Sequence, residues 1–277
     1  MLLRFTKMHG LGNDFMVVDL VTQRFKFNAQ MVKRLGDRQL GVGFDQLLVV
    51  ETPSNPDMDF RYRIFNADGS EVEHCGNGAR CFALFVRDKR LSVKKQISVE
   101  TAKGNMRLTI RDDRQVEVDM GAPILQPAEI PFIAERQQLS YQLQIENIDY
   151  QISAISMGNP HCVLVVDDVY TAPVAELAQS IQAEDVFPEG ANIGFMQIVS
   201  DSEINLRVYE RAVGETLACG TGACAAVVAG RQRGLLAEKV KVNVTGGSLE
   251  IVWLGGDTDP VIMTGPAINV FEGKMFI

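Results

Sequence analysis

The chain has 277 residues, of which 46% are hydrophobic and 22% charged, a composition typical of a soluble globular protein with one large or two ordinary domains. The formal net charge of −8 argues against a surface for nucleic acid or anionic membrane. No apolar run approaches the roughly 20 residues of a membrane span, and the first residues lack the apolar core of a signal peptide. Five cysteines, an odd number, argue against a secreted disulfide framework. We therefore expect a cytoplasmic protein.

The first half of the chain predicts a buried helix wrapped by strands. Asn28 is expected to cap a helix over 29–39. The residues after Cys75 are apolar on all sides as far as Arg87, which is typical of a helix buried on every side. Alternating or apolar segments predict strands around both helices, over 3–8, 15–20, 46–50, 58–65, 97–101, 106–111 and 116–120.

The second half repeats this order of elements after a less regular connection over 121–144. Residues 157–161 are expected to form a turn, Pro173 to open a helix that runs to about Gln182, and a second apolar helix to follow Cys219. The expected strands cover 149–156, 163–166, 193–199, 204–209, 240–244, 249–254 and 261–264.

Matching residues recur at a nearly constant spacing. Cys219 stands 144 residues after Cys75, and each cysteine precedes a Gly-x-Gly turn and a helix-compatible apolar run. The same spacing relates Arg63-Ile64-Phe65 to Arg207-Val208-Tyr209, Met120-Gly121 to Thr264-Gly265 and the two helix starts, and a spacing of 146 relates Gly12-Asn13 to Gly158-Asn159. Five such matches in chain order indicate a duplicated αβ domain.

The duplication predicts a chemical role for the two cysteines together. A thiol ahead of a helix N-terminus meets unpaired N–H groups, which can lower its pKa from about 8.5 to roughly 3.5–7.5. If the two halves pack about a pseudo-twofold axis, Cys75 and Cys219 would flank a small molecule in an interdomain cleft. One thiolate could then remove an α-proton while the other thiol reprotonates the opposite face. Proximity disfavours two thiolates at once.

Other interpretations of the cysteines were weighed against this one. Cys81, Cys162 and Cys224 are expected to be small buried hydrophobes. A zinc site from His74, Cys75, Cys81 and Cys219 lacks a C-x₂₋₄-C pair, so no metal is expected. A redox disulfide between Cys75 and Cys219 lacks a C-x-x-C motif, and the Gly-x-Gly turns lack the lysine of a phosphate-binding loop.

The sequence resembles the diaminopimelate epimerase family over nearly its full length. The motifs that carry the resemblance are Met8-His9-Gly10-Leu11-Gly12-Asn13-Asp14-Phe15, Gly41-Val42-Gly43-Phe44-Asp45-Gln46, Glu73-His74-Cys75-Gly76-Asn77-Gly78-Ala79-Arg80-Cys81, Gly158-Asn159-Pro160-His161 and Glu210-Arg211 with Ala218-Cys219-Gly220-Thr221-Gly222. The resemblance implies a cofactor-independent isomerase that interconverts LL- and meso-2,6-diaminopimelate for lysine and peptidoglycan precursor synthesis in the bacterial cytoplasm.

The resemblance also implies roles for particular residues. Cys75 and Cys219 would be the acid/base pair, assisted by His161 and Glu210. The reacting carboxylate would be held by backbone N–H groups of Gly76, Asn77, Gly220 and Thr221. The remaining substrate-binding residues would be Asn13, Gln46, Asn66, Asn159, Asn192, Glu210 and Arg211. From the residues alone, the asparagines in turns could equally serve turn chemistry, His161 could be a satisfied loop histidine, and His9 and His74 are expected to be structural or to support the site.

The implied fold is α+β, with two pseudo-symmetric domains that each form a mixed β-barrel-like sheet around a central buried helix. The N-terminal domain would span 1–120 and be completed by the tail 266–277, and the C-terminal domain would span 121–265. The resemblance further implies a homodimer, with Phe271 as a candidate contact.

Three other functions stay open at this point. A proline or hydroxyproline racemase would use a similar pair of thiols, although Glu210 and Arg211 favour a longer substrate with a second carboxylate. A thiol-redox or zinc-binding protein is the alternative from another class. A binding module without turnover would not need both cysteines.

Overall fold

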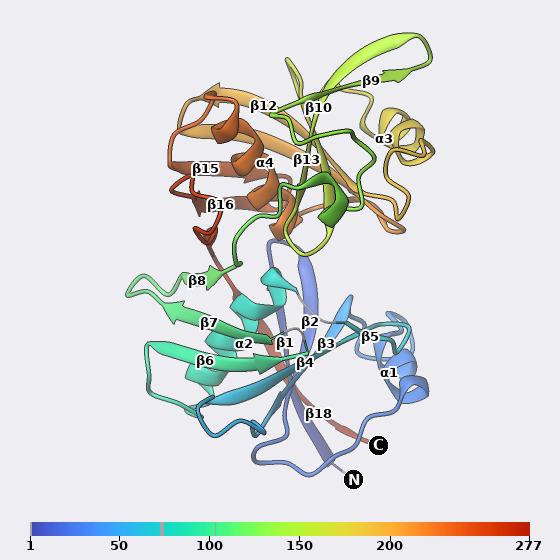
Figure 1. The fold of residues 1–277 in the computed structure, drawn as a ribbon. Helices are drawn as coiled ribbons and strands as arrows, with labels where there is room; N and C mark the ends of the chain where they lie inside the picture. The colour runs from blue at the N-terminus through green and yellow to red at the C-terminus, as the bar shows by residue number, and fades with distance from the viewer. Residues whose placement is uncertain (1, 73–74, 103) are drawn as a thin grey trace. The chain divides into compact units, whose positions relative to one another are not determined.

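The computed structural model describes residues 2–72, 75–102 and 104–277. The chain forms two compact units: unit 1 contains Met1–Asp119 and Thr264–Ile277, and unit 2 contains Met120–Met263. Each unit is a mixed sheet around a central buried helix, α2 in unit 1 and α4 in unit 2 (Figure 1). The predicted α+β fold class is therefore confirmed.

Unit 1 builds a curved sheet from strands distant in the chain. Its order is β18–β1–β2–β3–β4–β6–β7–β8, with the short β5 beside β4. Among the strand pairs of unit 1 that the structure describes, β2–β3 and β4–β6 are parallel and the others antiparallel. The elements are β1 (Leu2–Gly10), β2 (Asn13–Asp19), α1 (Ala29–Gly36), β3 (Gln46–Glu51), β4 (Phe60–Asn66), β5 (Glu71–Val72), α2 (Gly76–Asp88), β6 (Gln96–Thr101), β7 (Gly104–Ile110), β8 (Val116–Asp119) and β18 (Ile268–Phe276).

The two faces of this sheet bury two different helices. Alternate residues of a strand point to opposite faces, so Phe15 and Leu48 approach α2 while Met16 and Leu47 pack in the core that contains Val32 of α1. Both faces of β2 and β3 are consequently covered, which explains their unbroken apolar sequences. Helix α2 contacts β1, β2, β3, β7, β8 and β18, and its residues from Gly76 to Val86 are buried.

Unit 2 repeats this arrangement. Its sheet order is β9–β10–β11–β12–β13–β15–β16, with β14 beside β13, and the parallel pairs are β11–β12 and β13–β15. Helix α4 contacts β10, β11, β12, β13 and β16. The elements are η1 (Pro127–Glu129), β9 (Tyr141–Ile145), β10 (Ile148–Ser156), β11 (Pro160–Val165), α3 (Val174–Gln182), β12 (Asn192–Ser200), β13 (Glu203–Glu210), β14 (Gly214–Thr216), α4 (Gly220–Gln232), β15 (Lys239–Val244) and β16 (Gly247–Val252). Strand β17 (Ile262–Gly265) spans the chain boundary between unit 2 and unit 1.

The duplication extends to individual side-chain contacts. Arg63 forms a bidentate ion pair with Glu71, at 2.7 and 2.8 Å, beside the β4–β5 hairpin. Arg207 and Glu215 make the same pair at 2.6 and 2.7 Å beside β13–β14. Helices α2 and α4 have 13 residues each and begin directly after Cys75 and Cys219. The predicted duplication is therefore present at the level of elements and contacts.

Several predicted boundaries were wrong. Helix α1 ends at Gly36 rather than near Gln39, because the Asp37 carboxylate accepts from the N–H groups of Gln39 and Leu40 and turns the chain. Residues 141–144, placed in the irregular connection, belong to strand β9 (Tyr141–Ile145), which pairs with β10. His161, expected in a turn, lies in strand β11, which begins at Pro160 and pairs with β10 and β12. The capping of α1 by Asn28 is confirmed, since its Oδ1 accepts from the Met31 N–H at 2.9 Å.

Within the described ranges, none of the helices has the length and hydropathy needed to cross a bilayer.

Candidate active-site residues

Cys75 occupies the N-cap position of α2. Its backbone is extended, with φ −151° and ψ 107°, and its sulfur accepts a hydrogen bond from the Gly78 N–H at 3.4 Å. The N–H groups of the first helical turn have no partners within a helix, so an acceptor at the N-cap satisfies one of them. Gly76 and Asn77 are buried in this first turn. The thiol is therefore presented at the positive end of the helix dipole, as predicted.

A close contact with β4 requires glycine in the same turn. A Cβ at Gly78 would lie 2.4 Å from the hydroxyl oxygen of Tyr62. Tyr62 is buried, and its hydroxyl has no hydrogen-bond partner among the described residues. Burial raises the pKa of Tyr62, and the nearby Cys75 and Cys81 sulfurs raise it further. The tyrosine therefore stays neutral beneath the helix N-terminus.

Carboxamide side chains surround the first turn of α2. Asn13, at the start of β2, accepts from the Cys75 thiol at 3.7 Å and from Asn77 Nδ2 at 3.4 Å. The fully buried Arg80 donates to Asn77 Oδ1 at 2.9 Å and to the Pro266 carbonyl at 3.1 Å. Cys75, Asn13 and Asn77, all predicted site residues, are thus in contact, and we call them the Cys75 cluster.

Gln46 and Asn66 form a second polar pair in unit 1. They are directly opposed in the β3–β4 ladder, and Gln46 Nε2 donates to Asn66 Oδ1 at 3.0 Å. Asn66 Nδ2 donates to the Ser70 hydroxyl at 3.1 Å, which donates in turn to Asp68 at 2.6 Å. A carboxylate can only accept, so this chain of donors fixes the orientation of both carboxamides.

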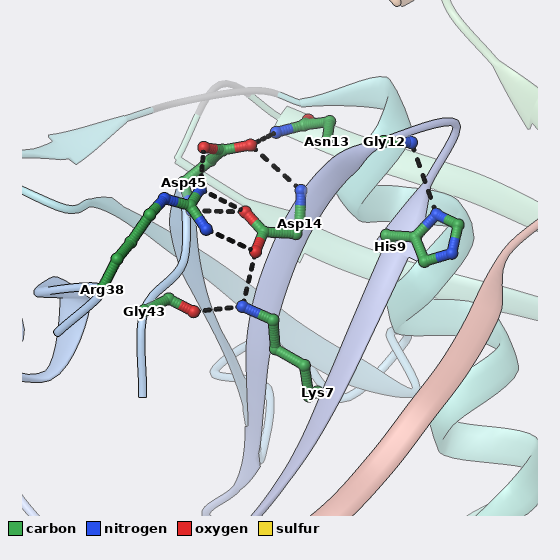
Figure 2. Close-up of polar contacts among 8 residues, drawn as sticks. All are labelled: Lys7, His9, Gly12, Asn13, Asp14, Arg38, Gly43 and Asp45. Atoms are coloured by element: carbon green, nitrogen blue, oxygen red, sulfur yellow. Dashed lines mark hydrogen bonds and ion pairs between the residues drawn. The ribbon is translucent and has the colours of Figure 1, made fainter. Parts of the chain in front are cut away.

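Charged residues that sequence reasoning did not single out support the Cys75 cluster. Asn13 Nδ2 donates to Asp45, and Asp45 forms an ion pair with Arg38 (Figure 2). Arg38 also donates two hydrogen bonds to the Asp14 carboxylate. Asp14 and Asp45 stand inside the motifs quoted above, each next to a predicted site residue. That adjacency was the available signal.

Cys219 occupies the equivalent N-cap of α4. It is 5% exposed, and its sulfur lies 3.6 Å from the Thr221 hydroxyl. Burial raises the pKa of the Cys219 thiol well above its usual range, and the neighbouring Glu210 carboxylate adds to this through its charge and a hydrogen bond. Contacts from Thr221 and from the Gly222 N–H oppose the shift. Cys219 is therefore a thiol, not a thiolate, in this state.

The other predicted residues of unit 2 take part in three separate contacts. His161 Nε2 lies 3.1 Å from Asn159 Oδ1, and burial lowers the pKa of His161 to about 3. Asn192 Oδ1 accepts from the Arg211 backbone N–H at 2.9 Å, and the Arg211 guanidinium donates to the Glu189 carbonyl. Thr216 donates to Glu210 at 2.5 Å. With Cys219 and Thr221, these side chains line one end of the unit 2 sheet, since β11 and β12 begin there and the antiparallel β13 ends there.

The remaining cysteines and His9 agree with a structural role. Cys81, Cys162 and Cys224 are fully buried as predicted, and burial raises the pKa of Cys81 and Cys162. His9 Nδ1 accepts from the Gly12 N–H at 3.3 Å in the β1–β2 turn. His74, which belonged to the zinc hypothesis, lies outside the described residues. Over 2–72, 75–102 and 104–277, no three His, Cys, Asp or Glu side chains are grouped to hold a metal ion.

Comparison with known proteins identifies the family. A family model described as diaminopimelate epimerase matches residues 5–126 and 153–270. A diaminopimelate epimerase from Pseudomonas entomophila is 60% identical over 275 residues, which is 99% of each chain. The chain belongs to the diaminopimelate epimerase family.

Solved structures with distant sequences share the fold of this epimerase family member. A PhzF-family phenazine biosynthesis protein from Bacillus anthracis has a TM-score of 0.71 at 16% identity, and the match covers 100% of both chains. A hydroxyproline epimerase from Agrobacterium vitis has a TM-score of 0.70 at 12% identity, covering 99% of this chain and 92% of that one. These likenesses support the architecture alone.

Proposed function

We propose that this chain is a diaminopimelate epimerase, an isomerase that interconverts LL- and meso-2,6-diaminopimelate without a cofactor. The observation that carries the proposal is the pair of cysteines at equivalent N-caps, Cys75 on α2 and Cys219 on α4, in a chain 60% identical along its length to a diaminopimelate epimerase. A racemase of proline or hydroxyproline is less well supported, because the hydroxyproline epimerase shares only 12% identity.

In the proposed mechanism the two cysteines act on opposite faces of one α-carbon. A thiolate removes the α-proton, so that the Cα–H bond breaks and an S–H bond forms. The electron pair remains on the α-carbon and is delocalised into the carboxylate. The opposite thiol then gives its proton to the other face, and its sulfur becomes the thiolate. Proton and charge balance, and the configuration at one carbon is inverted.

The electrostatics of unit 2 support Cys219 as the cysteine that holds its proton before turnover. Burial and the Glu210 carboxylate both favour the thiol. Cys75 would then be the base for the first half-reaction, and the reverse reaction would exchange the roles. His161 is neutral at physiological pH because burial lowers its pKa to about 3, so we assign it the orientation of Asn159 rather than proton donation.

The substrate would be bound through helix N-termini and carboxamides. Backbone N–H groups of Gly76, Asn77, Gly220 and Thr221 stand in the first turns of α2 and α4, where an anion is favoured. Asn13, Gln46, Asn66, Asn159 and Asn192 would contact the amino and carboxylate groups. Glu210 suits an ammonium group. The Arg211 guanidinium is exposed and would hold the distal carboxylate.

The family supplies the expected cellular setting. Diaminopimelate is a precursor of lysine and of peptidoglycan, so we place the enzyme in the bacterial cytoplasm, with the small-molecule substrate and no nucleic acid or membrane as partners. We also propose that it acts as a homodimer.

The deciding experiment measures epimerisation of diaminopimelate by Cys75→Ala and Cys219→Ala. Each variant should lose at least about 1,000-fold in kcat, because each face of the carbon loses its only acid or base. Cys162→Ala, in the apolar core of unit 2, is the control and should retain wild-type kcat. In D₂O the wild-type enzyme should incorporate deuterium at the α-carbon.

Two outcomes would contradict the proposal. Full epimerisation by either variant would exclude the two-cysteine mechanism. Stoichiometric zinc in the purified protein, or activity coupled to reversible thiol oxidation, would instead favour the metal or redox alternatives. A panel that includes proline and hydroxyproline tests the choice of substrate.

A further inference from the structure

The side-chain amide of Asn13 has different neighbours at its two ends. Its Oδ1 lies 3.7 Å from the sulfur of Cys75 and 3.4 Å from Asn77 Nδ2. Its Nδ2 donates to Asp45 Oδ2 at 2.9 Å. Either the oxygen or the nitrogen of a side-chain amide can face a neighbour. The oxygen of Asn13 faces the thiol, so another contact must hold the amide in this orientation.

The Asp45 carboxylate holds the Asn13 amide in this orientation. An ionised carboxylate accepts hydrogen bonds and donates none, so only the nitrogen of Asn13 can face it favourably. Arg38 Nη2 pairs with Asp45 Oδ1 at 2.7 Å, and the Asp14 backbone N–H donates to Asp45 Oδ2 at 3.0 Å. Both contacts stabilise the negative charge of Asp45 and hold the oxygen that Asn13 contacts.

The support for Asp45 is itself anchored in two strands and a loop (Figure 2). Arg38 binds Asp14 through two nitrogens at 2.8 and 3.0 Å, and Lys7 of β1 pairs with Asp14 at 2.5 Å. Lys7 also donates to the Gly43 carbonyl. Burial opposes ionisation of Asp14, but Arg38 and Lys7 outweigh it and hold the pKa of Asp14 well below its usual range. Asp14 therefore stays ionised when Asp45 is substituted.

Unit 2 lacks this device. The parallel ladder that pairs Phe15 with Gln46 corresponds to the one that pairs His161 with Asn192. The positions of Asp14 and Asp45 therefore correspond to Pro160 and Ala191, which carry no side-chain carboxylate. Asn159, the counterpart of Asn13, contacts His161 instead. The duplicated scaffold thus surrounds its two cysteines with different chemistry.

We propose that Asp45 is a positioning residue that fixes the amide of Asn13 so that a hydrogen-bond acceptor faces the Cys75 thiol. The inference rests on the proposed role of Cys75 as an acid/base. An acceptor beside the sulfur favours the protonated thiol, whereas a rotated amide would donate to the thiolate and favour ionisation. In the absence of substrate, Asp45 therefore raises the pH at which the Cys75 thiol loses its proton.

The test follows the ionisation of Cys75 in full-length Asp45→Asn. Alkylation by iodoacetamide, quantified by mass spectrometry of the peptide that contains Cys75, gives the pH midpoint for thiolate formation. The midpoint should fall by about half to one pH unit, because the new amide at position 45 permits Asn13 to rotate. The kcat for epimerisation should fall, because a thiolate that forms at lower pH is a weaker base for the α-proton.

A charge control and a double variant separate positioning from a simple charge effect. Asp112→Asn removes one negative charge from unit 1 at a residue that pairs with Lys95 and not with Asn13, so it should leave the midpoint unchanged. In an Asn13→Ala background, Asp45→Asn should cause no further shift. An equal shift in that background would show that Asp45 acts directly through its charge and would overturn the proposal. An unchanged midpoint in Asp45→Asn would also overturn it.

The alkylation readout needs no turnover, so it separates this proposal from the proposed function. Loss of the Asp45 effect with intact cysteine-dependent epimerisation would refute only the positioning role. Epimerisation that survives Cys75→Ala would refute the function, whatever the alkylation midpoint. Circular dichroism checks the fold of each variant. If Asp45→Asn does not fold, Asp45→Ser replaces it, because a serine hydroxyl can both donate and accept. The same shift of the midpoint is expected.

Discussion

His161 is a buried ionisable residue whose neutral form the fold selects. It is 1% exposed in β11, and burial lowers its pKa to about 3. In the unfolded chain its pKa is about 6.5, so between these values the unfolded state binds more protons than the folded state. The contribution of neutral His161 to stability is therefore fully present above about pH 6.5 and is lost as the pH falls.

We expect the free energy of unfolding to decline by up to about 1.4 kcal/mol per pH unit below pH 6.5 because of this residue. Urea unfolding at pH 7.5, 6.0 and 5.0 measures the decline. His161→Asn should show a smaller decline over the same range. The lowered pKa of Asp14 adds to acid sensitivity only as the pH falls through about 4, the ordinary pKa of an aspartate in the unfolded chain. Identical slopes for the wild type and the variant would contradict the assignment to His161.

The N-terminus of α2 packs closely against Tyr62 of β4. Gly78 stands against the Tyr62 hydroxyl, which has no hydrogen-bond partner among the described residues, so a methyl group there must displace a buried aromatic side chain. A larger residue at position 78 therefore requires either α2 or Tyr62 to move from its present position.

Gly78→Ala should lower the free energy of unfolding by about 1–3 kcal/mol, the usual cost of overpacking. Tyr62→Phe removes the clashing oxygen and should restore part of that loss in the double variant. Gly194→Ala in β12 is the matched control, because its Cβ would meet its nearest neighbour at 3.6 Å. Chemical denaturation of the wild type and the four variants gives the values. Additive effects of Gly78→Ala and Tyr62→Phe would show that the contact is not the cause.

Local patterns predicted the elements whose causes are local. The cap at Asn28 and the buried, largely apolar helix after Cys75 depend on neighbours in sequence, and both are confirmed. Strand β9 was missed although Tyr141, Leu143 and Ile145 alternate with polar residues, because prolines nearby suggested an irregular segment. The Asp45–Asn13 contact joins residues 32 positions apart and has no local pattern, so only the folded chain shows it.

At the scale of the whole molecule, β18 offers an apolar edge. It pairs with β1 at one side, and exposed apolar residues along it include Ile268, Val270, Phe271 and Phe276. Phe271 is 48% exposed, with its ring edge-on to Phe5 at 6.1 Å between centroids. Exposed apolar sheet edges favour association, which supports the proposed homodimer.

Phe271→Ala should shift the protein from dimer towards monomer, with at least about a tenfold rise in the dissociation constant, because a large apolar side chain leaves the interface. Sedimentation velocity over a range of concentrations measures this. Leu40→Ala, an exposed apolar position outside β18, should leave the association unchanged. A monomeric wild-type protein, or equal dissociation constants for all three proteins, would contradict the dimer contact.

The spacing of 144 residues predicted the duplication because equal spacing over many elements reports a common architecture. It could not predict β18. Most side chains of that strand are exposed, so no periodicity marks the face it presents, and its expected place came from the family resemblance. Nor could the duplication predict that Asn13 donates to a carboxylate while its counterpart Asn159 contacts His161, since equivalent positions carry different residues.

The pairing of β1 with β18 has a consequence for synthesis on the ribosome. Residues 120–263, which form the whole of unit 2, are translated before Ile268–Phe276. Unit 2 can therefore close while β1 still exposes the backbone groups that β18 will cover. In the nascent chain, the half of the protein that is translated first is the half that is completed last.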